Sequence, residues 1–378
     1  MNLVRASFQG RTPLLHVLLL ALLKGINGVN IIVGLKLSQM ASQGESNSMK
    51  LVEEMLGGAE RSLSRLISMV EMDTPDVPQI MKKIQPRTGK AYTIGITGPP
   101  GSGKSTLVDR LTAVARRKGL SVGIIAVDPT SPFSGGAVLG DRIRMQQHYL
   151  DEKVFIRSMA TRGCLGGLPR AAQGVIKLLD AFGKDLIIVE TVGVGQTELQ
   201  VMKTVDTTVV VLFPGGGDAI QTMKAGLMEI ANIFVVNKAD RPGADQLVAE
   251  LESMLSLNPK NPHWQVPILT TQAVNNVGTE ELYQEIERHR SVLESTGQLS
   301  LQRQKQRREE LTKAIEQEVS DRLSRLMEKD ENLIALSEKV ERGELDPYSA
   351  ARDILSNSAM LRGWFAKLES EDDGGARK

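Results

Sequence analysis

Cysteine is almost absent from this chain of 378 residues, and the single one, Cys164, cannot form a disulfide within the chain. The four histidines are scattered, so no cysteine and histidine cluster has the spacing of metal ligands. The composition therefore gives no indication of a disulfide framework or of a Cys/His metal site, and it favours a reducing compartment.

The chain also lacks an excess of charge of either sign. Its 46 basic and 45 acidic residues leave a formal net charge of +1, so electrostatics give no reason to expect nucleic acid or an anionic membrane as the main partner. The longest apolar run, Leu14 to Leu23, ends at Lys24 and is too short to span a bilayer. A hydrophobic content of 41% nevertheless allows a sizeable core, in one large domain with appendages or in two domains.

Residues 1–44 contain no aspartate or glutamate. Their four basic residues and their apolar run are typical of a targeting peptide. A start codon assigned too far upstream, with Met40 or Met49 as the real start, is the interpretation we prefer. We expect 1–48 to be an extension, and the protein to be cytoplasmic, or to lie in the mitochondrial matrix if the extension is a transit peptide.

The rest of the sequence predicts an α/β protein. Apolar residues at helical spacing indicate an N-terminal helical region over 49–88. From Ala91, short buried runs alternate with helical stretches, which is typical of a mostly parallel sheet with helices on both faces. The predicted strands are Tyr92–Thr97, Val122–Val127, Leu186–Glu190, Thr207–Phe213, Ile233–Val236 and Val266–Leu269.

The C-terminal part is charged and helical, with one apolar stripe. Such a stripe fits either a helix packed on its own domain or a helical arm that pairs two subunits, and the pattern does not distinguish them. The stripe consists of Leu311, Ile315, Val319, Leu323 and Leu326. We expect an α/β domain over 89–290, a helical arm over 291–370 and a disordered tail over 371–378.

The strongest motif follows the first predicted strand and fits the phosphate-binding pattern G-x-x-x-x-G-K-[ST] in full. Glycines let the backbone aim its N–H groups at phosphate oxygens, and the helix N-terminus that follows favours negative charge. Lys104 is expected to reach the β- and γ-phosphates, and Ser105 to offer a hydroxyl to Mg²⁺. The predicted phosphate-binding residues are Gly98, Pro99, Pro100, Gly101, Ser102, Gly103, Lys104, Ser105 and Thr106.

One predicted strand is followed by an acid, Asp128, and another ends in one, Glu190. The carboxyl ends of parallel strands meet at one sheet edge, so both acids are expected near the phosphate loop. We predict a metal shell of Ser105, Asp128, Asp141 and Glu190, and catalytic roles for Lys104, Asp141 and Glu190. Asp141 lies in a glycine-rich loop, where a loop-capping carboxylate is the alternative. Gly193, in Glu190-Thr191-Val192-Gly193, is expected to contact the γ-phosphate through its N–H.

The nucleotide base is indicated by a further motif, Asn237-Lys238-Ala239-Asp240, which follows the predicted strand Ile233–Val236. The Asp240 carboxylate can accept hydrogen bonds from N1–H and the 2-amino group of guanine. Adenine lacks that pair of donors, and an unpaired buried carboxylate is costly. The sequence therefore predicts GTP rather than ATP. Thr271, Gln272 and Ala273 stand where a supporting base loop is expected.

These motifs occur together with a longer string of segments. It consists of Val127-Asp128-Pro129-Thr130-Ser131-Pro132, Gly135-Gly136, Leu139-Gly140-Asp141-Arg142, Glu190-Thr191-Val192-Gly193-Val194-Gly195-Gln196, Gly215-Gly216-Gly217-Asp218, Lys224-Ala225-Gly226-Leu227-Met228-Glu229-Ile230-Ala231 and Asn237-Lys238-Ala239-Asp240. From roughly Met49 to Ser370 the chain resembles the ArgK/MeaB family of G proteins, the family of the methylmalonic aciduria type A protein. One departure is Arg162 and Cys164, where the family usually has a small residue.

The resemblance implies a Mg²⁺-dependent P-loop GTPase of the SIMIBI class, with its G domain over 89–290. It implies a chaperone of an adenosylcobalamin-dependent acyl-CoA mutase of the methylmalonyl-CoA mutase type, one that gates cofactor loading and protects the mutase. It also implies a homodimer with the C-terminal arm in the contact, and a role for Arg144, Asp218 and Lys224 in coupling to the mutase. The alternatives are a metallochaperone GTPase, or a kinase or ATPase linked to the transport of lysine, arginine and ornithine.

Overall fold

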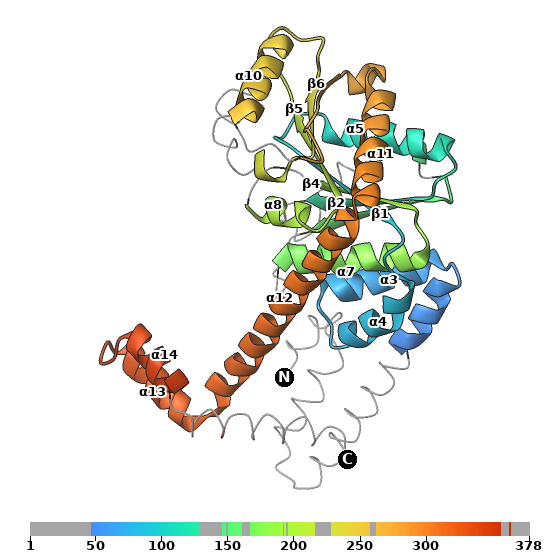
Figure 1. Ribbon diagram of the computed structural model, residues 1–378. Coiled ribbons are helices and arrows are strands. Elements are labelled where there is room, and N and C mark those ends of the chain that lie inside the picture. The colour runs from blue at the N-terminus through green and yellow to red at the C-terminus, as the bar shows by residue number, and fades with distance from the viewer. Residues whose placement is uncertain are drawn as a thin grey trace, which may run out of the picture.

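The structure is a computed structural model (Figure 1), and it describes 47–128, 146–148, 150–160, 167–191, 193, 196–215, 228–257, 262–356 and 363. Within these ranges the chain forms an α/β domain, a small helical layer beside it and a long helix that leads away from both. None of the helices in this part of the chain is both long and apolar enough to cross a membrane.

The sheet has seven parallel strands among the described residues, in the order β3-β2-β4-β1-β5-β6-β7. Every residue of β1, β4, β5 and β6 is buried, as expected for parallel strands covered on both faces. The strands are β1 (Tyr92–Thr97), β2 (Val122–Asp128), β3 (Val154–Ala160), β4 (Leu186–Thr191), β5 (Thr207–Leu212), β6 (Ile233–Asn237) and β7 (Ile268–Thr271).

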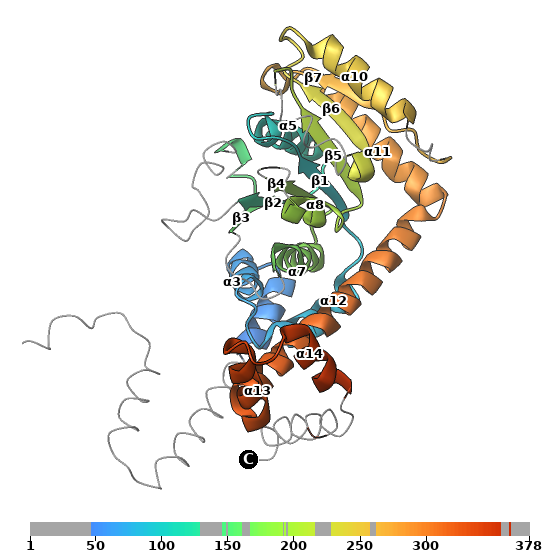
Figure 2. The same cartoon turned by 90° about the vertical axis from the view of Figure 1, so that its left-hand side faces the viewer.

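Helices cover both faces of this sheet (Figures 1 and 2). On one face lie α5 (Lys104–Arg117) and α11 (Thr279–Ser295). On the other lie α7 (Gly167–Phe182), α8 (Gln196–Met202) and α10 (Ala244–Leu257). Two N-terminal helices, α3 (Glu60–Glu71) and α4 (Val77–Ile84), pack on α7 and share its apolar core.

The parallel α/β fold predicted from the sequence is confirmed, and β1 has the predicted bounds. Strands β2, β4, β5 and β6 differ from their predictions by one residue at the C-terminal end, and β7 begins two residues later than predicted. Strand β3 was not predicted. It is an edge strand in which Arg157 interrupts the apolar run, and that side chain donates to Ser68 (3.0 Å) and pairs with Glu71 of α3.

The C-terminal helices begin with α12 (Gln298–Lys329), which runs away from the sheet and past the N-terminal helices (Figures 1 and 2). At its far end lie α13 (Glu331–Glu341) and α14 (Pro347–Ser356). The apolar stripe is largely exposed, at 60% for Leu311, 54% for Ile315 and 58% for Val319, and only Leu326 is buried. Leu311, Ile315, Val319 and Leu323 of the stripe are therefore not packed on the rest of the described chain, and their pairing with a second subunit stays a prediction.

Candidate functional site

The phosphate-binding sequence forms the connection between β1 and α5. A Cβ atom on Gly98 would lie 2.0 Å from the carbonyl oxygen of Val211, so only glycine lets the loop pass this close to β5. Gly103 has φ +91° and ends the loop at the first residue before α5. The sequence motif thus adopts the strand, loop and helix arrangement that a phosphate site requires.

The two polar residues at the start of α5 are buried beneath this loop. Lys104 Nζ donates to the carbonyl oxygens of Gly98 (2.8 Å) and Pro99 (3.0 Å). Ser105 Oγ donates to Glu190 Oε1 at 2.6 Å, and both side chains are buried. A hydroxyl and a carboxylate held this close are hard oxygen donors, so the pair fits the ligand preference of Mg²⁺.

Gly193 is held beside the end of the P-loop strand. Its carbonyl oxygen accepts hydrogen bonds from Thr97 Oγ1 and Thr191 Oγ1, each at 3.0 Å, and Thr191 Oγ1 also lies 2.8 Å from Thr97 Oγ1. These two threonines end the neighbouring strands β1 and β4. Sequence reasoning missed their role, although a hydroxyl residue at the ends of two strands beside the loop was a signal available in the sequence.

Asn237 joins three segments at the predicted base site. Its amide nitrogen donates to the carbonyl oxygen of Ser102 at 2.7 Å. Its amide oxygen accepts from Thr271 Oγ1 and from the backbone N–H of Ala273, each at 3.0 Å. The residues Thr271, Gln272 and Ala273 therefore lie beside the asparagine motif, and one buried side chain ties both to the P-loop.

Lys238, which directly follows β6, lies at the same edge of the sheet. Its Nζ donates to the carbonyl oxygen of Gly101 at 2.6 Å and lies 4.8 Å from the ring centroid of Phe213. Phe213, which follows β5, was not predicted as a site residue. Asp240 is exposed in the turn after β6, where the N–H of Ala239 donates to the carbonyl oxygen of Thr271 (3.1 Å). Its carboxylate is thus accessible beside the base loop.

Some predicted site residues lie outside the description. Asp128 ends β2 at the same sheet edge, and its side chain is not described. Asp141, Arg144, Asp218 and Lys224 lie outside the described residues, as do Arg162 and Cys164. Within the described ranges no group of three or more His, Cys, Asp or Glu residues could hold a metal ion. Of the predicted metal shell, the structure brings together Ser105 and Glu190.

A buried contact joins His148 to Asp109 of α5. His148 Nε2 is 3.3 Å from Asp109 Oδ1 and 3.1 Å from the Asp109 carbonyl oxygen, and both side chains are buried. The hydrogen bond with Asp109 raises the pKa of His148 above its usual value. The pair attaches residues 146–148 to the helix that begins at the phosphate site.

The comparison with protein families decides which family this site belongs to. The model of the methylmalonyl-CoA mutase-associated GTPase MeaB matches residues 63–328. The chain belongs to the MeaB family. The nucleotide site described above is therefore that of a MeaB-family GTPase, and the resemblance inferred from the motifs is confirmed.

Relatives of this MeaB-family chain come from all three domains of life. A Pyrococcus abyssi protein is 50% identical over 81% of this chain and 95% of its own length. GTPase ArgK of Escherichia coli is 36% identical over 74% of this chain and 87% of its own length. The mitochondrial methylmalonic aciduria type A homolog of Mus musculus is 33% identical over 72% of this chain and 66% of its own length.

A solved structure shares the fold. The crystal structure of an LAO/AO transport system kinase superposes with a TM-score of 0.61 at 28% identity, and the match covers 82% of this chain and 96% of that one. The match supports the fold described above, a parallel sheet covered by helices, as that of a P-loop protein.

Proposed function

We propose that this MeaB-family protein hydrolyses GTP to GDP and phosphate in a Mg²⁺-dependent reaction, and that it does so as a chaperone of an adenosylcobalamin-dependent acyl-CoA mutase. The observation that carries the nucleotide chemistry is the buried Ser105–Glu190 pair at 2.6 Å beneath the P-loop. Further support comes from Asn237 of the proposed base motif, which donates to the carbonyl oxygen of Ser102 in that same loop.

In the reaction the protein mainly positions groups and neutralises charge. The ammonium of Lys104 stabilises the negative charge of the β- and γ-phosphates. Ser105 and Glu190, with Asp128 and Asp141, would hold Mg²⁺; when the ion is bound, it neutralises phosphate charge as the bond to the γ-phosphate breaks. Gly193 contacts the γ-phosphate through its N–H, and Asp141 and Glu190 orient the attacking water.

Selection of guanine is assigned to Asp240. Its carboxylate accepts two hydrogen bonds from N1–H and the 2-amino group, a donor pair that adenine lacks. Lys238 supports the base from the side of the P-loop, since its ammonium contacts the carbonyl oxygen of Gly101. Thr271, Gln272 and Ala273 form the loop that closes the base site.

A mutase partner is supported by the description of the family and by the name of the mouse relative. We assign Arg144, Asp218 and Lys224 to the coupling between GTP hydrolysis and the mutase. Lys224→Ala is expected to leave GTP affinity intact while it changes the turnover measured in the presence of the mutase.

We also propose that the protein is a homodimer whose contact includes α12. The support is the row of exposed apolar side chains on that helix, Leu311, Ile315, Val319 and Leu323. Apolar residues at i, i+4 positions on a helix that leaves its own domain are typical of a face that packs on another helix. We place the protein in the cytoplasm, or in the mitochondrial matrix if residues 1–48 are a transit peptide.

The deciding experiment measures Mg²⁺-dependent hydrolysis of GTP and of ATP, with and without the adenosylcobalamin-dependent mutase of the source organism. GTP-selective turnover that changes when the mutase is added is the expected result. GTP-selective turnover that is indifferent to the mutase, with no complex formed, would retain the chemistry and exclude this partner. Equal turnover of ATP and GTP would contradict the assignment of Asp240.

A further inference from the structure

The C-terminal end of the short helix α8 packs against β1, the strand that precedes the P-loop. A Cβ atom on Gly95 of β1 would lie 2.5 Å from Met202 Sδ and 2.9 Å from Val205 Cγ2. Glycine at this position therefore allows the turn of residues 203–206, which follows α8, to approach β1 closely. Because α8 begins shortly after Gly193, it connects the γ-phosphate side of the site to this turn.

The outer side of the same turn is held by α12. Gln302 Nε2 donates to the carbonyl oxygens of Val205 (3.0 Å) and Asp206 (3.3 Å). Gln306 Nε2 donates to the carbonyl oxygens of Lys203 (3.0 Å) and Val205 (3.1 Å). Carbonyl groups beyond the end of a helix lack helical partners, and two side-chain amides of α12 supply donors for them here. We refer to Gln302, Arg303 and Gln306 as the clasp.

Arg303 fixes the clasp to the sheet. Its guanidinium donates to both carboxylate oxygens of Asp206 (2.8 and 2.7 Å) and to the carbonyl oxygens of Gly89 and Ala91 (2.8 Å each). The buried Asp206 carboxylate also accepts from the N–H (2.9 Å) and the hydroxyl (2.8 Å) of Thr93 in β1. The first turns of α12, the α8–β5 turn and the P-loop strand thus share one hydrogen-bonded network.

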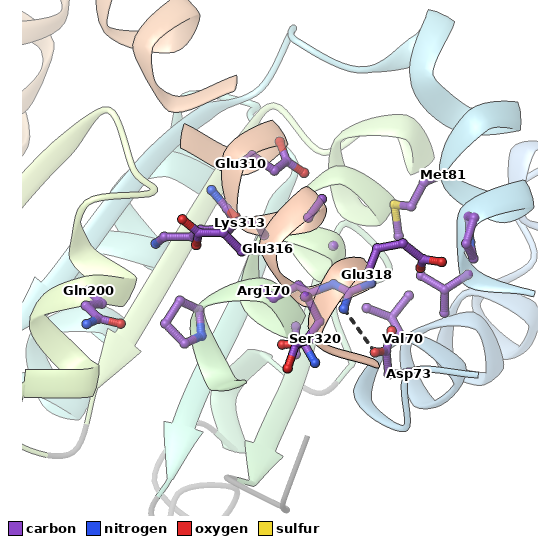
Figure 3. Close-up of a pocket in the computed structure, with 18 residues that line it drawn as sticks. Val70, Asp73, Met81, Arg170, Gln200, Glu310, Lys313, Glu316, Glu318 and Ser320 are labelled. Atoms are coloured by element: carbon purple, nitrogen blue, oxygen red, sulfur yellow. Dashed lines mark hydrogen bonds and ion pairs between the residues drawn. The ribbon is translucent and has the colours of Figure 1, made fainter. Parts of the chain in front are cut away.

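Beyond the clasp, α12 separates from the domain. Lys177 of α7 pairs with Glu310, and past this point a cavity of about 630 Å³ lies between α12 and the helices α3, α4 and α7 (Figure 3). Its walls include Met81, Arg170 and Lys313. The orientation of α12 is therefore set mainly near its N-terminal end, where the clasp lies.

We propose that the clasp couples the nucleotide site to α12. Gln302 and Gln306 hold the turn that follows α8, and through α8 they position Gly193 for hydrolysis. In the reverse direction, a movement of α8 that follows the loss of the γ-phosphate changes the contacts at the start of α12. Gln302 and Gln306 are positioning residues in this scheme, because neither touches the nucleotide. The inference rests on the proposed GTP hydrolysis and extends it to the arm.

The test compares Gln302→Leu/Gln306→Leu with a matched control, Gln304→Leu. Gln304 lies on the same helix but is exposed and makes only a 3.5 Å contact with Ser300. In the full chain, kcat for GTP is expected to fall about fivefold in the double variant, as for a lost hydrogen bond, with KM unchanged. The control is expected to behave as the wild type in both kcat and KM.

Hydrogen exchange provides the second measurement, and it does not depend on turnover. With GDP and with a non-hydrolysable GTP analogue, wild-type backbone amides over 298–310 are expected to differ in protection. In the double variant that difference is lost, while the difference over 196–202 remains. If the variant keeps both wild-type kcat and the nucleotide-dependent difference in α12, the clasp does not couple the two sites.

Failure of the proposed function gives a distinct result. If the wild type binds GTP but does not hydrolyse it, the kinetic comparison has no signal and the proposed activity is wrong. Hydrogen exchange then decides the clasp alone: loss of the difference over 298–310 in the double variant supports it, and its persistence overturns it. Should the double variant be destabilised, Gln306→Leu alone is measured in the same way.

Discussion

At the scale of single residues, the motifs were readable from the sequence but their mutual contacts were not. Asn237 was predicted as part of a base motif, yet its hydrogen bonds to Ser102 and Ala273 depend on strands that are far apart in sequence. Phe213 carries no motif of its own, so its contact with Lys238 became visible only in three dimensions. A local sequence pattern identifies a motif residue. Its hydrogen-bond and ring partners come from other loops at the same sheet edge, so they are known only from the folded structure.

Gly103 provides a test of this packing. A Cβ atom there would lie 2.3 Å from Asn237 Nδ2, and the residue has φ +91°. Gly103→Ala is therefore expected to displace Asn237 and to weaken GTP binding more than tenfold, or by over about 1.4 kcal/mol. Fluorescent nucleotide titration measures it. Gly101→Ala is the control, because φ is also positive there (+77°) but no atom lies within 4 Å; equal losses in both variants would attribute the effect to backbone strain alone.

Asp240 provides a test of base selection. In Asp240→Asn the carboxylate acceptor becomes an amide with a donor, which complements the 2-oxo group of xanthine instead of the 2-amino group of guanine. The variant is expected to prefer xanthosine triphosphate over GTP by at least about tenfold. Competition binding with the two nucleotides measures this ratio. A uniform loss of affinity for both bases would count against the two-bond arrangement.

His289 links stability to pH. The side chain is buried against Trp264 and makes a 2.7 Å hydrogen bond with Thr207 Oγ1, and burial lowers its pKa from 6.5 to about 4. The unfolded chain therefore binds a proton more readily, so this contribution to stability is fully present above pH 6.5 and is lost as the pH falls toward 4. The free energy of unfolding is expected to fall by roughly 3 kcal/mol over that window.

Urea unfolding at stepped pH checks this expectation, with His289→Gln as the comparison. The neutral glutamine does not titrate, so the pH-dependent part assigned to His289 is expected to disappear in the variant. Identical slopes of unfolding free energy against pH in the two proteins would show that other groups cause the dependence. Asp206 and Arg288, which act on the pKa of His289 in opposite directions, are retained in both.

At the scale of helices and strands, the sequence was most informative where burial is complete. The largely apolar, fully buried runs of β1, β5 and β6 were predicted because strands covered on both faces are rich in apolar residues. Strand β3 was not predicted because an edge strand tolerates a charged residue in its apolar run, and here Arg157 pairs with Glu71 of α3. The position of α12 was not predictable either, since it depends on polar contacts such as Arg303–Asp206 rather than on an apolar pattern.

Replacement of Arg303 tests how much its ion pair with Asp206 contributes to the attachment of α12 to the sheet. In Arg303→Met the buried Asp206 carboxylate loses its cation, and removing one partner of such a pair is expected to destabilise the fold by about 3 kcal/mol. Arg322→Met is the control, because Arg322 pairs with Glu318 on the helix surface and its loss is expected to cost at most about 1 kcal/mol. Chemical denaturation gives both values, and equal losses would contradict the assigned role of Arg303.

At the scale of the whole molecule, the sequence predicted a helical C-terminal region and left its packing open. The exposed stripe on α12 leads to a prediction about assembly. Ile315→Glu with Val319→Glu introduces two charges into this face and is expected to convert a dimer into monomers. Sedimentation equilibrium measures the mass, with Ser324→Glu, exposed on the same helix outside the stripe, as the control. A wild type that sediments as a monomer would remove the proposed dimer.

Because α12 is long, a small change in the contacts at its start moves its far end by a large distance. From Arg303 to its last residue, Lys329, the helix rises about 39 Å, so a tilt of only about 10° about Arg303 displaces the far end by about 7 Å. With its pivot at Arg303 and its tip at α13 and α14, α12 has the proportions of a lever arm. A sub-ångström shift of two glutamine contacts beside the sheet would thus be amplified into a displacement that a bound partner could sense.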